Sequence, residues 1–341
     1  MNTNIIVESA KKNNELGLFR GKIGEIIYYF YSSTPILSHK DAKEILNNIY
    51  QNINTSLPLT LKDGLLGIGI AINILMYKSY IKGNVDHILK DIDEYIYKLY
   101  ERSLYEKFKD TKKDQIKIQH EILLYYSIRL KYGLRNKNDR SIYENLVIDT
   151  FNYIYMNKKD SYFNEPIPYS IDNYLLVDFL ISLSILFNQN ICKKRIYLLL
   201  REVGSQVFSR IPILQANRIF LLYAIHLINI EIHDKEWENY ESYLKNSISI
   251  NKLLTDEIKN RQILFSDGLG SCYLFLSLYN ISTNNNMPID QKLFLDKFKK
   301  SKMWNDFDNI HFLNKYIGLD GFFGLKLLIE YADSKLNKHE I

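Results

Sequence analysis

The stretch Asp63-Gly64-Leu65-Leu66-Gly67 decides the fold, because the chain uses it three times. It recurs as Asp267-Gly268-Leu269-Gly270-Ser271 and as Asp320-Gly321-Phe322-Phe323-Gly324, and the middle copy has its second glycine one residue early. An apolar run of helical character follows each copy, at 68–76, 273–279 and 325–331. A fixed phrase at a fixed place in a helical unit indicates a repeat architecture.

Weaker copies of the unit extend the repeat along the chain. The positions equivalent to the first glycine are 21, 64, 120, 173, 216, 268 and 321, so the steps between them run from 43 to 56 residues. Apolar residues elsewhere also fall mostly at helical spacing, as in the amphipathic stretches 41–50 and 85–105. The spacing suits units of two helices with variable loops. We therefore predict an all-α fold, an α/α toroid of about seven helical hairpins with one helix of each pair inside.

Composition limits the class of protein. The 341 residues are 46% hydrophobic, which suffices for a large core, and no linker divides the chain, so we predict a single domain over 1–341. The positive excess is small and spread out, 44 − 39 = +5, and gives little support for nucleic acid as a partner. Two cysteines, Cys192 and Cys272, are typical of a reducing compartment, so a cytoplasmic location is expected.

No membrane-spanning or signal segment is expected. Residues 1–12 have no apolar core of signal-peptide length, and no apolar run is long enough to span a bilayer. Peripheral association with a membrane surface stays open.

Glycine and aspartate in the repeated phrase have a structural interpretation. A glycine at a helix start permits a sharp turn and a close approach of neighbouring chain. An aspartate just ahead of it can cap the free N–H groups of the first turn. For Asp63 and Asp320 we favour this capping interpretation over a role in binding.

The glycine phrases resemble those of the lanthionine cyclase family (LanC-like proteins). The stretches 21–24, 64–67 and 321–324 carry Gly-x-x-Gly before an apolar helix, and the resemblance extends over about 17–331. It implies an α/α toroid of seven hairpins. Members that are cyclases use zinc to activate a peptide cysteine thiolate, which adds to a dehydrated serine or threonine and closes a thioether ring.

The chain departs from that family at the metal. The family's ligands are a cysteine in a Trp-Cys-x-Gly phrase of the fifth unit and a Cys-His pair before glycine in the sixth. Here Leu214-Gln215 precede Ala216, and Ser266-Asp267 precede Gly268. Leucine cannot ligate a metal, and serine is a poor zinc ligand beside thiolate, imidazole and carboxylate. We therefore expect no zinc and no other cofactor.

Polar side chains at the unit starts are the candidate site residues. Toroid closure would gather them at one mouth, where carboxylates could bind a basic peptide or act as an acid/base pair. His120, at the start of the third unit, could transfer protons near neutral pH, although a histidine with no such role, on the surface or in the core, is the more common case. The candidates for catalysis are Ser266, Asp267 and His120, and those for substrate binding are Asp63, Asp172, Gln215, Arg218 and Asp320.

Three functional hypotheses follow. The leading one is a zinc-less LanC-like protein of ribosomal peptide biosynthesis, of the lanthipeptide or a related thioether-peptide class, that binds a precursor peptide or a modifying enzyme. The alternative is an enzyme with metal-free chemistry at the former zinc mouth, such as a cyclase or a carboxylate-based hydrolase, since toroids also serve glycosidases that need two carboxylates. A structural interaction protein is the third, because fold does not fix function.

Overall fold

The computed structural model describes residues 3–105, 112–133, 137–157, 164–166, 174–258, 268–283, 287 and 289–339. Every regular element within these ranges is a helix, so the all-α prediction is confirmed. None of the helices in the described ranges has both the length and the apolar content needed to cross a bilayer.

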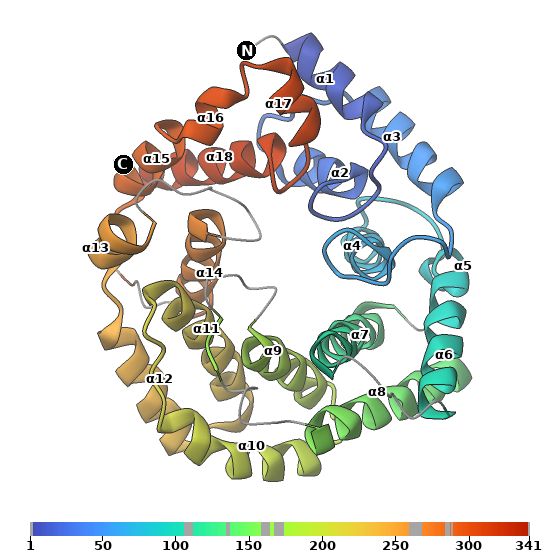
Figure 1. The fold of residues 1–341 in the computed structure, drawn as a ribbon, viewed down its shortest axis with the longest axis vertical. Helices are drawn as coiled ribbons and strands as arrows, with labels where there is room; N and C mark the ends of the chain where they lie inside the picture. Colours follow the sequence, from blue (N-terminus) through green and yellow to red (C-terminus); the bar gives the residue numbers. More distant parts are fainter. Residues whose placement is uncertain are drawn as a thin grey trace.

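An inner set of helices surrounds the centre of the molecule (Figure 1). Each packs against the next member along the chain, and the last packs against the first, so the described members form a closed circuit. Most of them are apolar over much of their circumference. The inner set is α2 (Lys22–Tyr31), α4 (Leu65–Tyr77), α7 (Lys112–Tyr132), α9 (Leu175–Asn188), α11 (Gln215–Ile232), α14 (Gly268–Thr283) and α18 (Phe322–His339).

An outer set covers the inner one (Figure 1). Its longer members each alternate with inner helices along the chain, and α3, α8, α10, α12 and α15 pack directly on them. The outer set is α1 (Thr3–Lys12), α3 (His39–Asn52), α5 (Val85–Ile88), α6 (Lys90–Tyr105), α8 (Lys137–Asn157), α10 (Lys193–Phe208), α12 (Lys235–Ser247), α13 (Ile250–Lys252), a π-helical turn Leu253–Glu257, α15 (Gln291–Lys299), α16 (Lys302–Asp306) and α17 (Ile310–Lys315).

Burial explains which helix of each pair lies inside. In α4 all positions from Leu65 to Asn73 are buried, as suits a helix with neighbours on every side. In α3 only Ala42, Ile45 and Ile49 are buried, which is the single stripe of a helix with one face toward water.

Repeat boundaries follow the predicted positions with one clear exception. Six inner helices begin within two residues of the position expected for them. The predicted start of the third unit is wrong, because α7 already begins at Lys112 and position 120 lies in the helix interior. The stretch 85–105 is also not one helix, since it divides at Leu89 into α5 and α6.

The loops before α2, α4 and α18 lie directly on the helix starts that follow them. Leu65 N–H donates to Pro58 O at 2.9 Å, and Lys22 N–H donates to Glu15 O at 3.0 Å, in both cases seven residues back. Phe322 N–H donates to Tyr316 O at 2.8 Å, six residues back. Backbone carbonyls thus satisfy first-turn N–H groups that would otherwise need side-chain caps.

This contact explains the Gly-x-x-Gly spacing. A Cβ at Gly64 would collide with Pro58 O, and one at Gly67 would collide with Leu61 O. Residues three apart on a helix face the same side, so both glycines face the same loop. Gly321 and Gly324 meet the loop before α18 in the same way.

One buried carboxyl group stands out in the first inner helix. Glu25 is fully buried, and its Oε1 accepts a hydrogen bond of 2.8 Å from Asn13 Nδ2. Its Oε2 has no hydrogen-bond partner among the described residues. Burial raises the pKa of this carboxyl group to about 8, against the opposing effects of Asn13 and of the Lys22 charge.

Replacing Gly64 by alanine should destabilise the fold by about 2 kcal/mol or more, because the new Cβ forces backbone away from the start of α4. Urea unfolding followed by circular dichroism measures the change. Gly204→Ala in α10 is the control. A Cβ there meets only side-chain atoms of Phe208 and Trp237, so its effect should be within about 1 kcal/mol of zero. Equal losses for both variants would contradict the loop contact as the cause.

Glu25→Gln should stabilise the protein increasingly as pH rises. The unfolded carboxyl ionises near pH 4.5 and the folded one near pH 8, so the native glutamate loses stability across that interval and glutamine does not. We expect no difference at pH 4 and a gain on the order of 1 kcal/mol or more at pH 8. Thermal melts at both pH values measure it, with the exposed Glu8→Gln as control. A gain independent of pH would refute the assignment.

Candidate functional site

Asp63 and Asp320 tie neighbouring helix starts together. Asp63 Oδ1 accepts from Arg20 N–H at 3.3 Å, and its Oδ2 lies 3.8 Å from Arg20 Nε. Asp320 Oδ2 lies 3.2 Å from Lys62 Nζ. The capping expected of these aspartates is therefore done by loop carbonyls. The Asp63 carboxylate connects the second unit with the first, and the Asp320 carboxylate connects the last unit with the second. Burial raises the pKa of Asp63, although the Arg20 charge acts in the opposite direction.

Backbone hydrogen bonds reinforce the same junction. Phe19 N–H donates to Lys62 O at 3.0 Å, and Asp320 N–H donates to Phe19 O at 2.8 Å. One residue of the first unit thus bridges the second unit and the last. We call this set of contacts among Phe19, Arg20, Lys62, Asp63 and Asp320 the closure junction.

Gln215 lies at the first position of α11 and is held from two sides. Its N–H donates to Glu257 Oε1 at 2.6 Å, and its side-chain Oε1 accepts from Ser249 N–H at 2.7 Å. The Glu257 carboxylate also accepts from Ala216 N–H at 3.1 Å. A carboxylate at a helix start satisfies free N–H groups and suits the positive end of the helix dipole.

Arg218 is bound to backbone on both sides of α11. Its Nε donates to Pro212 O and its Nη1 to Ser247 O, each at 2.7 Å. These bonds connect the loop before α11 with the end of α12. They use two of the five N–H donors of the guanidinium and hold it in place between these two segments.

His120 lies in the interior of α7, where it is 1% exposed, and its ring meets Phe179 of α9 edge-on at 5.6 Å between centroids. Burial lowers the pKa of the imidazole to about 3. A proton donor or acceptor for neutral pH needs a pKa near 7. The described surroundings therefore favour a packing role.

Three predicted residues, Asp172, Ser266 and Asp267, lie outside the described residues. The structure brings Asp63 and Asp320 to one junction. Gln215 and Arg218 lie at the start of α11, and His120 is buried between α7 and α9.

The described residues do not supply the zinc ligands of the LanC-like family that the chain resembles. At the matching position of the fifth unit, Leu214 is aliphatic and Gln215 Oε1 already accepts from Ser249 N–H. The described residues contain no group of three or more His, Cys, Asp or Glu side chains arranged to hold a metal.

A buried cluster not predicted from the sequence joins α11, α12 and α14. Glu241 accepts from His226 Nδ1 at 2.9 Å, from Asn229 Nδ2 at 2.6 Å and from the Tyr279 hydroxyl at 3.0 Å. These bonds lower the pKa of the carboxyl group, although burial alone would raise it. Because the cluster lies between helices, we interpret it as a structural tie.

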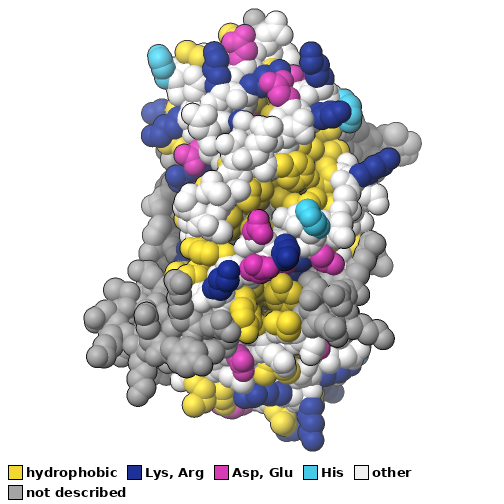
Figure 2. Space-filling view, turned by 90° about the vertical axis from the view of Figure 1, so that its right-hand side faces the viewer, with side chains coloured by type: hydrophobic (Ala, Val, Ile, Leu, Met, Phe, Trp, Pro, Cys, Tyr) yellow, Lys and Arg dark blue, Asp and Glu magenta, His cyan; other side chains and the backbone are white. Residues whose placement is uncertain are grey.

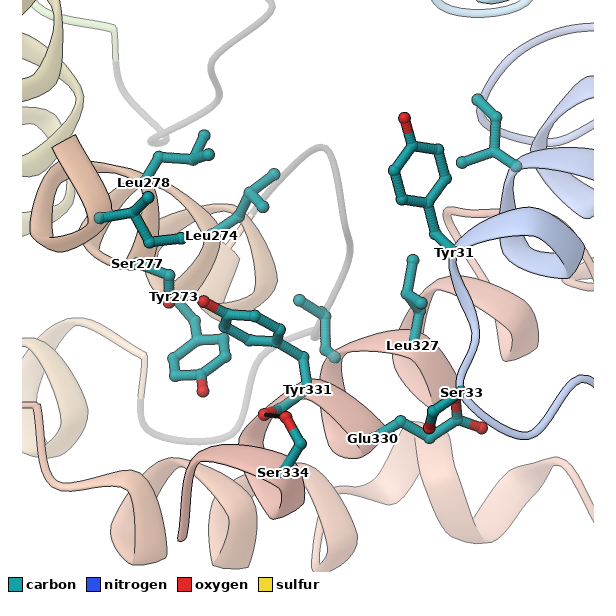
Figure 3. Close-up of a pocket in the computed structure, with 13 residues that line it drawn as sticks. Tyr31, Ser33, Tyr273, Leu274, Ser277, Leu278, Leu327, Glu330, Tyr331 and Ser334 are labelled. Carbon is teal, nitrogen blue, oxygen red and sulfur yellow. Dashed lines mark hydrogen bonds between the residues drawn. The ribbon is translucent and has the colours of Figure 1, made fainter. Parts of the chain in front are cut away.

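A cavity of about 530 Å³ lies between the C-terminal parts of three inner helices, α2, α14 and α18 (Figure 3). In Figure 3, Tyr31 from α2 and the pair Leu274 and Leu278 from α14 point into the same space, with Leu327 from α18 beside them. The cavity lies toward the helix ends opposite to the glycine phrases. The lining residues are Ile27, Tyr31, Ser33, Tyr273, Leu274, Ser277, Leu278, Ile281, Leu327, Leu328, Glu330, Tyr331 and Ser334.

Tyrosines gather at these same helix ends. Tyr31 meets Tyr80 edge-on at 5.5 Å between centroids, and Tyr77 of α4 meets Tyr132 of α7 at 4.5 Å. Burial, together with the neighbouring phenols of Tyr80 and Tyr132, raises the pKa of Tyr31. Burial and the nearby Tyr132 phenol likewise raise the pKa of Tyr223 of α11. The phenols of four inner-helix units thus lie near one another.

Sequence reasoning missed this cavity because it concentrated on the helix starts. A signal existed in the run Tyr28-Tyr29-Phe30-Tyr31 at the end of α2 and in the spacing of Leu274, Leu278 and Ile281. Residues at that spacing share one helix face. Ile281 is 59% exposed, so this face of α14 is not fully buried against neighbouring helices.

The outer surface is mixed in charge where Figure 2 displays it. Acidic, basic and histidine side chains are interspersed on this face, and hydrophobic side chains show between them. A nucleic-acid surface typically gathers Lys and Arg in a patch or stripe. The described residues of this face do not form one.

Comparison with protein-family models, with curated proteins and with solved structures finds no match for this chain. The resemblance to LanC-like proteins therefore stays a prediction.

Lys62→Met should destabilise the protein by about 1–3 kcal/mol, because the Asp320 carboxylate, on a residue 4% exposed, loses its ion-pair partner. Asp320→Asn in the same background should recover part of the loss, since it removes the negative charge from this buried position. Urea unfolding of both single variants and the double variant gives the coupling energy. Strictly additive losses would show that the pair does not contribute to closure.

Proposed function

We propose that this protein is a zinc-less LanC-like α/α toroid of seven helical hairpins that binds a precursor peptide in ribosomal peptide biosynthesis. The observation that carries the proposal is the apolar cavity among α2, α14 and α18, inside the circuit of inner helices. Concave, mostly apolar spaces with a few polar groups are the usual form of ligand sites.

The glycine phrases support the toroid part of the proposal. They lie at the starts of inner helices, where the loops before α2, α4 and α18 rest on the first turn. We take these loops to be part of a scaffold that the chain shares with LanC-like proteins. Retention of the scaffold without matching ligands in the fifth unit fits a binding protein better than a zinc-dependent cyclase.

A modifying enzyme is the other partner consistent with this proposal. We place the peptide first because the cavity is an internal space, whereas enzyme docking would use an outer face. Metal-free catalysis has less support among the described residues. Asp63 and Asp320 are each beside a cation, and His120 is held neutral by burial.

The proposal is tested by zinc content and by chemistry on a model substrate. Purified protein should contain well below one equivalent of zinc by elemental analysis. Incubated with a synthetic peptide carrying one cysteine and one dehydroalanine, it should leave the thiol open to alkylation, as mass spectrometry can determine. The immobilised protein should nevertheless enrich peptides from a random peptide library.

One equivalent of bound zinc, or thioether formation faster than in the absence of the protein, would favour the cyclase hypothesis instead. A library passed over the protein without any enrichment would refute peptide binding. His120→Ala is not a suitable control, because the side chain is buried and its loss would disturb the fold. Protein unfolded in urea and not refolded measures the background enrichment of library peptides.

A further inference from the structure

The cavity among α2, α14 and α18 has a composition that defines what it can hold, provided that the proposed function in peptide binding is correct. Its walls are mainly aliphatic and aromatic. In Figure 3 the side chains of Leu274 and Leu278 face that of Tyr31 across the space, and the Tyr331 ring extends from α18 toward α14 beneath them. A volume of about 530 Å³ is within the usual range for ligand pockets.

The charge of the cavity is already balanced. Among the described residues of its lining, Glu330 alone has a charged side chain. Its carboxylate accepts from Ser32 Oγ at 2.6 Å and from Thr34 Oγ1 at 3.2 Å, and it lies 3.2 Å from Lys326 Nζ. An anionic ligand would meet this carboxylate, and a cationic one would compete with Lys326. An uncharged group therefore fits best, because it enters without paying for an unpaired charge.

One buried hydroxyl in the wall keeps acceptor capacity. Ser277 is 6% exposed, and its Oγ lies beside the Tyr273 phenol, which donates its own proton to Gln291. The Ser277 hydroxyl can donate to that phenol oxygen, and its lone pairs can still accept a hydrogen bond from an N–H group of a ligand.

We infer that the cavity is a specificity pocket for a large uncharged side chain, aliphatic or aromatic, of a bound peptide, and that Ser277 Oγ offers it a hydrogen bond. The exposed phenol of Tyr31 lies at the same site, on a side chain 46% exposed. Tyrosine is common where proteins hold peptides, since it provides a rigid ring and a hydroxyl at little entropic cost. A fatty acid fits less well than a neutral group, because its carboxylate would meet that of Glu330.

The pocket is tested first with small neutral probes. N-acetyl-tryptophanamide and N-acetyl-leucinamide should bind the folded protein in saturation-transfer NMR, whereas N-acetyl-lysinamide and hexanoate should not. Leu278→Trp should abolish the binding by filling the space. Leu198→Trp is the matched control, because Leu198 is 56% exposed on the outer helix α10, and it should bind like the wild type.

Ser277→Ala should lower the affinity for N-acetyl-tryptophanamide roughly two- to tenfold, which is the effect of losing one hydrogen bond. Unchanged binding in this variant would remove Ser277 from the proposal. Binding of lysinamide or hexanoate as strong as that of the neutral probes would overturn the chemical class. Absence of binding by any probe would overturn the pocket itself.

The random library separates this inference from the proposed function. Peptides enriched by the wild type should carry a large apolar residue, and Leu278→Trp should lose that preference. Enrichment that is identical in wild type and Leu278→Trp would leave peptide binding intact and refute the pocket. Probe binding blocked by Leu278→Trp, with no library enrichment, would leave the pocket intact and refute the peptide as its occupant.

Discussion

The structure depends on hydrogen bonds between loop carbonyls and the first turns of inner helices. Pro58 O and Tyr316 O take the place of side-chain caps at α4 and α18, and they lie so close that a Cβ at Gly64 or Gly321 would strike them. These hydrogen bonds fix the loops in position, and the fixed loops in turn form hydrogen bonds with one another. The closure junction around Phe19 is the result.

Sequence patterns predicted the helical class and most inner-helix starts because both depend on local features, namely apolar spacing and glycine. The third unit was misplaced because α7 has polar residues in its first turns, so its apolar run begins well after Lys112. The partners of Asp63 and Arg218 could not be predicted. Arg20, the partner of Asp63, comes from the first unit, and Arg218 binds backbone carbonyls outside its own helix, so apolar spacing along one helix carries no information about either contact.

The two ends of the inner helices differ in chemistry. At the glycine ends, the described polar side chains are committed to holding the fold, as Lys62 with Asp320 illustrates. At the opposite ends, phenols and leucines surround a cavity, and the Ser277 hydroxyl in its wall can accept a hydrogen bond from a ligand. Polar residues at helix starts attract attention in a sequence, yet in this protein the apolar end offers the better binding site.

The closure junction also has a consequence for synthesis of the chain. Phe19 is made 320 − 19 = 301 residues before Asp320, whose N–H donates to the Phe19 carbonyl. Contacts between such distant residues form slowly, since the intervening chain must be ordered first. While the ribosome works, the apolar flank of α2 that α18 will cover stays exposed, so this flank is where a nascent chain needs protection against aggregation.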